Sequence, residues 1–513
     1  MNALNRRDMM ALSAAFAAFS GGAKAQDQRE FGMTLGDATP FSADMVRERA
    51  KALAAKPYVP PRQVPRAWQD LTYDQYRAIW FDTRNGLWRD TDRPAQVEFF
   101  APGLYFPAPI AINVVDDDRA TMRPVMFDLE VFDRTDMFPD LPINDTLGYS
   151  GFRLHGEIET PGVKSEYAVF QGASYFRAIG RGQTYGLSAR GIALDTASPE
   201  GEEFPDFREF WIEAPAPGSS ETVIHALLDG PSVTGAYRFA IAHGDVTVMD
   251  IEATVFARRE LENVGLGAET SMFLFDHTNR SQFDDFRSAV HDSDGLLMAN
   301  GAGEILWRPL ANPRQLQVSS FVDSTPKGFG LMQRSRELED FADLQAHYHQ
   351  RPGLWVTPGE DWGDGAVTLI EIPADREIYD NIVAYWRPRT PIPAGGSHHF
   401  TYRLDWCAKA PIPTDRARVL NSRMGARHGG GRIVTIDFAR HSKLPEDLSN
   451  VAIHVSANHG TVSEGVLQNN PETGGVRLAF TFDPGERNNI ELRAQLMMEQ
   501  KAASEVWLYR WTN

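Results

Sequence analysis

Two short segments place carboxylates where they could do acid–base chemistry. Val290–Gly295 reads VHDSDG and carries Asp292 and Asp294, while Tyr379–Trp386 reads YDNIVAYW and carries Asp380. Cleavage of a glycosidic bond needs two such groups, one that protonates the departing oxygen and one that activates water. Asp before Ser or Asn is also ordinary turn chemistry, so two unrelated Asx-turns are the alternative.

Further candidate side chains lie between residues 284 and 386: Tyr348, Arg351, Trp355, Glu371, Glu377, Tyr385 and Trp386. Asp292 and Asp294 would share one face of an extended segment, roughly 7 Å apart. Like charges that close raise the pKa of one carboxyl, which suits an acid or a base. For Trp355, Trp362 and Trp386, both sugar stacking and core packing stay open.

Composition argues against several other classes of function. The chain has 51 basic and 69 acidic residues, a net charge of −18, which does not suit a nucleic-acid binder. The single cysteine, Cys407, excludes an internal disulfide and a Cys-based zinc site. The pairs His347/His349 and His398/His399 lack the helical His–Glu spacing of zinc hydrolases. We expect no metal and no cofactor.

The elements that must position these residues are predicted to be strands. Short runs of alternating hydrophobic residues recur between Gly, Pro, Asn and Asp, at spacings typical of antiparallel sandwiches. The clearest are Gln96–Phe100, Val125–Phe132, Tyr167–Phe170, Tyr237–Ile241, Val246–Phe256 and Ser271–Phe275. Met45–Ala55 and Ser335–Tyr348 are the best candidates for helices. The pattern predicts an all-β protein with a few short helices.

The first 25 residues are predicted to be a signal peptide. Arg6 and Arg7 precede an apolar run, and Ala23 and Ala25 supply the small residues that a signal peptidase reads. The paired arginines are similar to a twin-arginine (Tat) export signal, with an ordinary Sec signal as the alternative. Either route predicts a periplasmic protein.

A domain boundary is expected near the C-terminus. Residues 408–416 contain Pro411 and Pro413 and read as a linker after a last strand at His398–Trp406. The remainder, 417–513, has the length and strand count of an immunoglobulin-like sandwich. We therefore expect an N-terminal β-sandwich domain over 26–407 and a small C-terminal one.

Nine blocks of the sequence, in this order, resemble the family of periplasmic glucan biosynthesis proteins G and D (OpgG/OpgD, also called MdoG/MdoD). The blocks are Leu71–Arg77 (LTYDQYR), Pro102–Phe106 (PGLYF), Gly172–Ala178 (GASYFRA), Tyr185–Gly191 (YGLSARG), Pro231–Tyr237 (PSVTGAY), His291–Gly295 (HDSDG), Trp307–Leu310 (WRPL), Lys327–Leu331 (KGFGL) and Asp380–Trp386 (DNIVAYW). The resemblance covers nearly the whole chain after the leader. It implies a large sandwich similar to galactose mutarotase that carries a glucan-binding cleft, followed by an immunoglobulin-like domain.

The same resemblance implies work on osmoregulated periplasmic glucan, whose backbone is β-1,2-linked glucose. Family members include anomer-inverting endo-β-1,2-glucanases, and at least one relative is a transglycosylase. By motif, Asp380 corresponds to the general acid and Asp292 to the general base. Tyr348 and Glu377 correspond to residues that hold substrate or relay the proton. We add Arg351, Trp355, Asp294 and Trp386 as candidates for the same tasks, with Asp294 as the rival base.

Two classes of function stay open at this point. One is an endo-β-1,2-glucanase, or a transglycosylase using the same acid. The other is a non-catalytic glucan-binding scaffold that assists an inner-membrane glucan synthase. The sequence does not decide between hydrolysis and transfer, between a G-type and a D-type member, or between a monomer and a homodimer.

Overall fold

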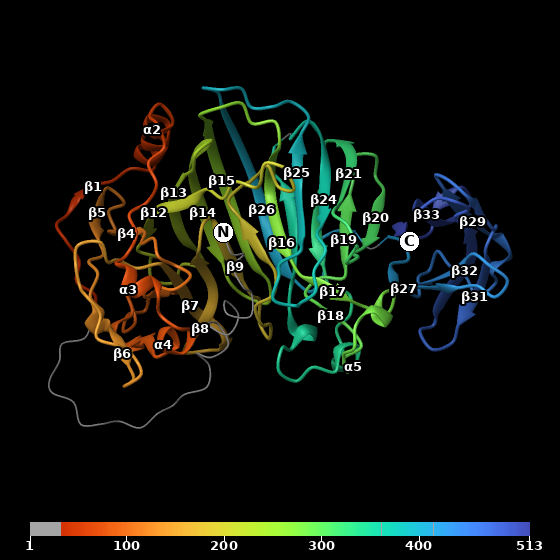
Figure 1. Cartoon of the computed structure of the whole chain (residues 1–513), viewed down its shortest axis with the longest axis horizontal. Helices are drawn as coiled ribbons and strands as arrows, with labels where there is room; N and C mark the ends of the chain where they lie inside the picture. Colours follow the sequence, from red (N-terminus) through yellow and green to blue (C-terminus); the bar gives the residue numbers. More distant parts are fainter. Residues whose placement is uncertain (1–31, 361, 414) are drawn as a thin grey trace. The chain divides into compact units, whose positions relative to one another are not determined.

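The computed structural model describes residues 32–360, 362–413 and 415–513, so the signal peptide expected at 1–25 lies outside the described residues. The described chain consists mainly of strands in several sheets, which confirms the all-β class (Figure 1). It divides into two compact units. Unit 1 contains the described residues up to Thr270, with Pro358–Gly365 and Tyr385–Cys407. Unit 2 contains Ser271–Thr357, Ala366–Ala384 and Ala408–Asn513.

Unit 1 contains strands of two large sheets. One set runs in the order β1 (Thr39–Pro40), β5 (Thr121–Pro124), β4 (Ala111–Val115), β12 (Asp206–Glu213), β13 (Thr222–Asp229), β14 (Val233–Ala242), β15 (Thr247–Ala257) and β26 (Ser397–Cys407). The other runs in the order β16 (Val264–Ser271), β10 (Ser188–Arg190), β9 (Tyr175–Ala178), β8 (Val163–Gln171), β7 (Gly151–Thr160) and β3 (Gln96–Phe100), with β11 (Ala193–Leu194) also on β16. A separate pair joins β2 (Ile79–Phe81) and β6 (Phe132–Arg134).

Aromatic rings fill the space between these two sets of strands. Phe170 and Phe176 of one set contact Phe239 of the other, with ring centroids 5.3 and 5.2 Å apart. Phe210 of β12 meets Phe152 of β7 edge to face at 5.0 Å. Because alternate residues of a strand point to opposite faces, one face of each set supplies this core. Unit 1 therefore has the packing of a β-sandwich.

Three α-helices lie between β1 and β2 in the chain: α2 (Ala43–Ala54), α3 (Arg66–Gln69) and α4 (Tyr73–Arg77). The helix predicted at Met45–Ala55 is confirmed as α2, which begins where the Ser42 side chain accepts a hydrogen bond from the Met45 backbone N–H. Its buried residues Val46 and Ala50 pack against Trp211 and Leu227 of the sheet.

Unit 2 contains a run of strands in the order β23 (Gly353–Pro358), β22 (Gly328–Met332), β19 (Gly295–Ala299), β20 (Ile305–Pro309), β35 (Val506–Thr512), β33 (Asn489–Met498) and β29 (Val451–Ala457), with β34 (Lys501–Ala502) on β33. β21 (Gln317–Ser324), β24 (Asp364–Glu371) and β25 (Ile382–Pro388) form another run, and β17 (Phe273–Phe275) pairs with β18 (Val290–His291). The division between the units passes through β24 and β25. The parallel pairing of β35 with β20 brings the end of the chain into a sheet built from residues about 200 positions earlier.

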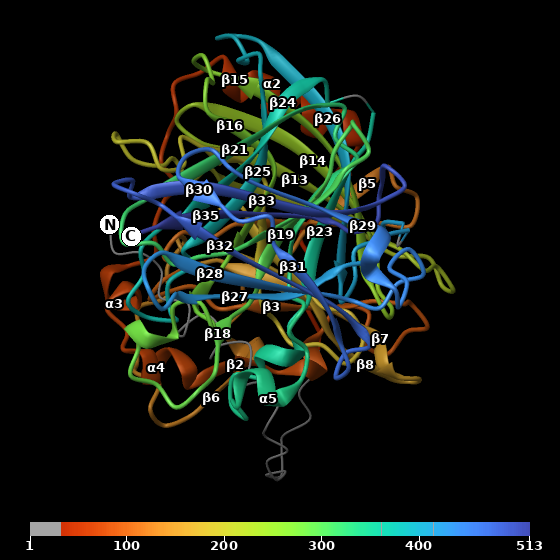
Figure 2. The same ribbon diagram turned by 90° about the vertical axis from the view of Figure 1, so that its right-hand side faces the viewer.

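The remaining strands of unit 2 form a sheet of their own: β27 (Val419–Ala426), β28 (Arg432–Phe438), β32 (Gly475–Asp483) and β30 (Thr461–Val462), with β31 (Val466–Asn470) on β32. Figure 2 shows β28 and β32 in one layer and β33 and β35 in another. Phe480 and Trp507 pack edge to face between these layers, 6.1 Å apart. The described residues of 408–513 belong to the same compact unit as Ser271–Thr357 and Ala366–Ala384. The boundaries expected at 407 and 416, the immunoglobulin-like domain and the mutarotase-like cleft stay predictions.

Two local predictions are wrong. The helix predicted at Ser335–Tyr348 is instead the single turn α5 (Leu338–Phe341) and a 3₁₀ turn at Tyr348–Gln350. Ala342 and His347 adopt left-handed backbone conformations, and the Asp343 carboxylate accepts hydrogen bonds from the Gln345 and Ala346 N–H groups, so the helix cannot continue.

The second wrong prediction is the strand at Val125–Phe132. Residues Leu129–Val131 form a 3₁₀ turn, and only Phe132 belongs to a strand, β6. The Asp128 side chain accepts a hydrogen bond from the Glu130 N–H at 2.8 Å. This local bond starts the turn, although the hydrophobic pattern is strand-like.

No helix within the described ranges is long and apolar enough to cross a membrane.

Candidate active site

Asp292 lies directly after β18 and is completely buried. Its backbone N–H donates to the Met272 carbonyl at 2.9 Å, which fixes the turn that carries the carboxylate. One carboxylate oxygen accepts a hydrogen bond from Arg351, which is itself 4% exposed. A buried carboxylate needs such a partner, because leaving one charge unpaired inside a protein is costly.

Asp380 lies in the loop between β24 and β25 and is half-buried. The next residue, Asn381, anchors this loop. Its side-chain oxygen accepts from the Phe273 N–H at 2.9 Å, and its amide donates to the Phe273 carbonyl at 2.9 Å and to the Ile372 carbonyl at 3.0 Å. Asn381 is 2% exposed, so these bonds have little competition from water.

The two aspartates are therefore anchored to consecutive residues. Met272 holds the backbone of Asp292, and Phe273 holds the residue after Asp380. Both aspartates also act on one cation. Burial is the largest influence on Arg351 and lowers its pKa, while the charges of Glu377, Asp343 and, least of the three, Asp380 act in the opposite direction. Segments 88 residues apart in sequence thus meet in one part of unit 2.

Tyr348 and Glu377 belong to the same cluster. The Tyr348 hydroxyl donates to the Glu377 carboxylate at 3.1 Å, and the Arg351 guanidinium lies over the Tyr348 ring, 4.2 Å from its centroid. Glu377 also accepts from Arg287 at 2.6 Å, and Arg287 reaches Asp343 at 2.9 Å. Burial is the largest influence on the pKa of Arg287 and lowers it, but Asp285, Glu377 and Asp343 together outweigh burial and raise this pKa.

Asp294 is placed differently from its neighbour Asp292. Its carboxylate oxygens accept from the backbone N–H groups of Arg334 and Ser335, all at 2.9 Å. The bonds hold a turn after β22 in place, a structural task that occupies both oxygens. Asp294 as the rival general base stays a prediction.

The two tryptophans proposed for the site are both buried. Trp355 is 1% exposed within β23, where its ring occupies the space that a side chain at Gly328 would need. Trp386 is completely buried in unit 1 and lies 6.4 Å from Trp362, centroid to centroid. Burial of both rings favours core packing over stacking on a sugar.

Glu371 is also completely buried and pairs with Arg308 at 3.1 Å. It accepts the Ala311 N–H at 2.7 Å, and burial raises its pKa. Within the described residues there is no cluster of three or more His, Cys, Asp or Glu side chains that could hold a metal ion.

Comparison with known proteins decides the family. The family model described as "Periplasmic glucan biosynthesis protein, MdoG" matches residues 41–511. The chain belongs to this family.

Curated members of the family are similar over most of their length. "Glucans biosynthesis protein G" of Shewanella sp. (strain ANA-3) is 48% identical over 477 residues, which cover 92% of this chain and 87% of that protein. "Glucans biosynthesis protein G 1" of Shewanella oneidensis has the same identity and coverage. The protein G of Shewanella baltica (strain OS195) is 47% identical over 477 residues.

Sequence reasoning missed several residues that hold the family's candidate site together. Gln333, 1% exposed, contacts His291 at 2.8 Å and donates to the Tyr348 carbonyl. Arg287 and Asn381 were also missed as organising residues. Asn381 stands in a block quoted for the resemblance, which is the only signal that could have found it. Arg287 and Gln333 have no local pattern that distinguishes them from surface residues.

Proposed function

We propose that this chain is a periplasmic protein that processes osmoregulated glucan as an anomer-inverting endo-β-1,2-glucanase. Asp380 protonates the departing glycosidic oxygen, and Asp292 removes a proton from the water that attacks the opposite face of the sugar. The anomeric configuration is inverted because the attack is direct, with no covalent intermediate. Such a mechanism needs the two carboxyl groups roughly 6.5–9.5 Å apart, so that water fits between base and sugar.

The shared anchoring of the two aspartates carries this proposal. Asp292 is tied to Met272, Asp380 is held through Asn381 to Phe273, and the charges of both act on Arg351. The names of the Shewanella relatives, which refer to glucan biosynthesis, support the substrate class. Tyr348 and Glu377, hydrogen-bonded beside the pair, suit the roles of holding a sugar hydroxyl or passing on its proton.

The burial of Asp292 favours a different function, a non-catalytic glucan-binding protein. A completely buried carboxylate paired with arginine is also a common structural ion pair. The direct test is incubation of the purified mature chain with linear β-1,2-glucan. Short oligosaccharides of inverted configuration support the glucanase. Cyclic or lengthened products indicate a transglycosylase, and unchanged chains indicate a binding protein.

Replacing the proposed acid gives the first prediction. Asp380→Asn should lower kcat on β-1,2-glucan by about 10²–10⁴-fold, because the amide cannot protonate the leaving oxygen. Asp375→Asn is the matched control, since Asp375 lies in the same loop with its side chain 79% exposed. Undiminished cleavage by Asp380→Asn would remove this residue from the acid role.

The base is tested by comparing Asp292→Asn with Asp294→Asn. We expect a loss of similar size for Asp292→Asn and a smaller loss for Asp294→Asn, because an amide oxygen in the position of Oδ2 still accepts from the Arg334 and Ser335 N–H groups. Because Asp292 pairs with a buried arginine, thermal unfolding of each variant must show that it is folded at the assay temperature. A larger loss for Asp294→Asn would transfer the base role to that residue.

A further inference from the structure

A cavity in unit 1 has no part in the chemistry proposed above. Its volume is about 100 Å³, and its lining runs from Pro61 to Phe210, entirely within unit 1, whereas both candidate catalytic aspartates belong to unit 2. This space holds about three water molecules, at about 30 Å³ each, so one sugar ring can enter it in part and a chain of rings cannot. The lining residues that matter here are Tyr105, Phe106, Gln171, Tyr175, Asp206 and Arg208.

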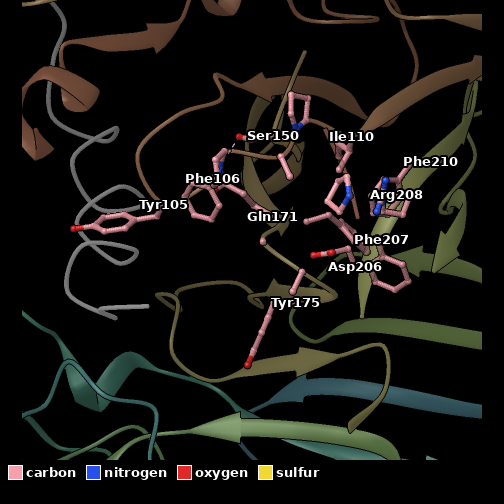
Figure 3. Close-up of a pocket in the computed structure, with 17 residues that line it drawn as sticks. Tyr105, Phe106, Ile110, Ser150, Gln171, Tyr175, Asp206, Phe207, Arg208 and Phe210 are labelled. Atoms are coloured by element: carbon pink, nitrogen blue, oxygen red, sulfur yellow. Dashed lines mark hydrogen bonds between the residues drawn. The ribbon is translucent and has the colours of Figure 1, made fainter. Parts of the chain in front are cut away.

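A β-bulge changes the direction of the Arg208 side chain. Between β12 and β13 the pairing shifts from Phe207 with Leu228 to Glu209 with Leu227, so Arg208 is the extra residue. Bulges of this kind redirect a side chain and are common beside functional sites. Asp206 and Arg208, on either side of Phe207, both line the cavity, and Figure 3 shows them opposite Tyr105 and Phe106.

The Arg208 side chain lacks a full set of partners. Its Nη1 atom is buried and makes no hydrogen bond to any part of the chain that the structure describes. A buried donor of this kind calls for an acceptor, which a bound ligand or an ordered water molecule can supply. The Asp206 carboxyl group can accept hydrogen bonds, whereas Arg208 only donates them. Burial is the largest influence on its pKa and raises it, with Arg208 acting in the opposite direction.

The walls between these groups are aromatic. Phe106, Phe207 and Phe210 line this space, whereas the Tyr105 and Tyr175 side chains extend away from it (Figure 3). The Arg190 guanidinium lies over the Tyr175 ring at 5.1 Å. Ring faces pack against the C–H groups of sugars, while the polar groups fix orientation. An anion would be repelled by an ionised Asp206, and a cation by Arg208. A neutral polyol both accepts from the arginine and donates to the carboxyl.

We propose that this cavity binds one neutral glucosyl unit of the glucan. Arg208 donates a hydrogen bond to one sugar hydroxyl oxygen, and Asp206 accepts a hydrogen bond from a sugar hydroxyl group. This site deepens the proposed function, because its ligand is taken from the class of the proposed substrate. It is a binding site and takes no part in bond cleavage.

A crystal soak tests occupancy directly. Crystals of Asp380→Asn, soaked with the β-1,2-linked glucose disaccharide sophorose, should show a sugar ring in the cavity within hydrogen-bond distance of Arg208. Water alone in the cavity, with or without sugar near Asp292, would overturn the proposal. The soak is repeated at several sophorose concentrations, and the occupancy of the cavity should rise gradually with concentration. Binding at crystal concentration only would also overturn the proposal.

Calorimetry with sophorose gives the solution test. In the Asp380→Asn background, Arg208→Met should weaken binding at this site about ten-fold, because a charged hydrogen bond is lost. The control is Arg238→Met, an arginine of the same unit that is 40% exposed with its nearest carboxylate 4.0 Å away. If Arg208→Met and Arg238→Met bind sophorose with equal affinity, the proposed site is wrong.

These results remain distinct from the fate of the glucanase proposal. Sugar in the cavity of a chain that cleaves no glucan would support this site and reject the enzyme. If Asp380→Asn loses cleavage and Arg208→Met binds sophorose with unchanged affinity, the glucanase proposal is supported and the cavity site is rejected. If Arg208→Met does not fold, the soak of Asp380→Asn still decides the question.

Discussion

At the scale of single residues, Arg351 does the most to hold the candidate site together. It binds the Asp292 carboxylate, donates to the Ala346 carbonyl through Nη2 at 2.9 Å, and covers the Tyr348 ring. A lysine could replace its charge but not this planar set of contacts. One guanidinium therefore connects the proposed base to the aromatic part of the cluster.

Removal of this guanidinium should destabilise the fold. We expect Arg351→Met to lower the free energy of unfolding by about 3–5 kcal/mol, because Asp292 is left buried and unpaired. Urea unfolding measures the loss. The double variant Asp292→Asn with Arg351→Met should recover part of it, since the uncompensated charge is gone. If the two losses simply add, the pair contributes no coupling and this reading of the cluster is wrong.

The sequence predicts the chemical types of the site but not its geometry. Asp292 and Asp380 stand out because of the blocks around them, and only the resemblance indicates that they converge. Nothing local shows that Asn381 would clamp Phe273, because that contact spans 108 residues. Burial of Trp355 and Trp386 could not be predicted either, since an aromatic ring serves equally well in a core and in a binding site.

At the scale of elements, the turn between α5 and Tyr348 matters most for the site. The Asp343 carboxylate caps the Gln345 and Ala346 N–H groups and also binds Arg287, which holds Glu377. Desolvation raises the pKa of Asp343, but these bonds outweigh it and the net pKa is lowered. The turn thus forms part of the support for Tyr348 and Glu377.

This lowered pKa predicts a pH dependence. A carboxyl with a lowered pKa in the folded state stabilises the fold above its unfolded pKa of about 3.9, and the contribution is lost as pH falls through the folded pKa. Asp343→Asn should therefore cost about 1 kcal/mol near neutral pH and progressively less below about pH 4. Unfolding of both proteins from pH 7 to pH 2 measures this. Glu339→Gln, an exposed change in α5, is the control. A difference that stays constant with pH would contradict the prediction.

Several strands could be predicted from short runs rich in hydrophobic residues between turn-forming residues. Gln96–Phe100 matches β3 residue for residue, and Val246–Phe256 matches β15 to within one residue at each end. The failures at Val125–Phe132 and Ser335–Tyr348 have one cause, an aspartate side chain that binds nearby backbone N–H groups. Such local bonds override hydrophobic periodicity, and periodicity alone does not show them.

At the scale of the whole molecule, unit 2 depends on the last hundred residues. Glu505 binds the Arg334 guanidinium at 2.8 and 2.9 Å and accepts the Val419 N–H at 2.8 Å. The guanidinium also lies over the Trp307 ring at 3.6 Å. The Arg334 backbone N–H, in turn, is held by Asp294. The C-terminal segment is thus connected to the turn that carries the candidate base.

Truncation tests this dependence. A chain that ends at Cys407 removes the parallel partner of β20 and leaves Arg334 without Glu505. Breaking a buried pair costs about 3–5 kcal/mol, a large share of a typical folding free energy of 5–15 kcal/mol. We expect the truncated chain to lose cooperative unfolding of unit 2 and all glucan cleavage. Glu505→Gln in the full chain should show a milder loss of the same kind. A truncated chain with normal protection of amides in β19 and β20 would contradict this.

The anchoring of Asp292 and Asp380 on adjacent residues has a mechanical consequence. Because Met272 and Phe273 form one short stretch of backbone, we expect thermal motion of that stretch to displace both carboxyl groups together. The distance between the two carboxyl groups should therefore change less than the position of either group when the surrounding sheets move. For the proposed glucanase, this mounting would keep the gap for the attacking water nearly constant while the two carboxyl groups move.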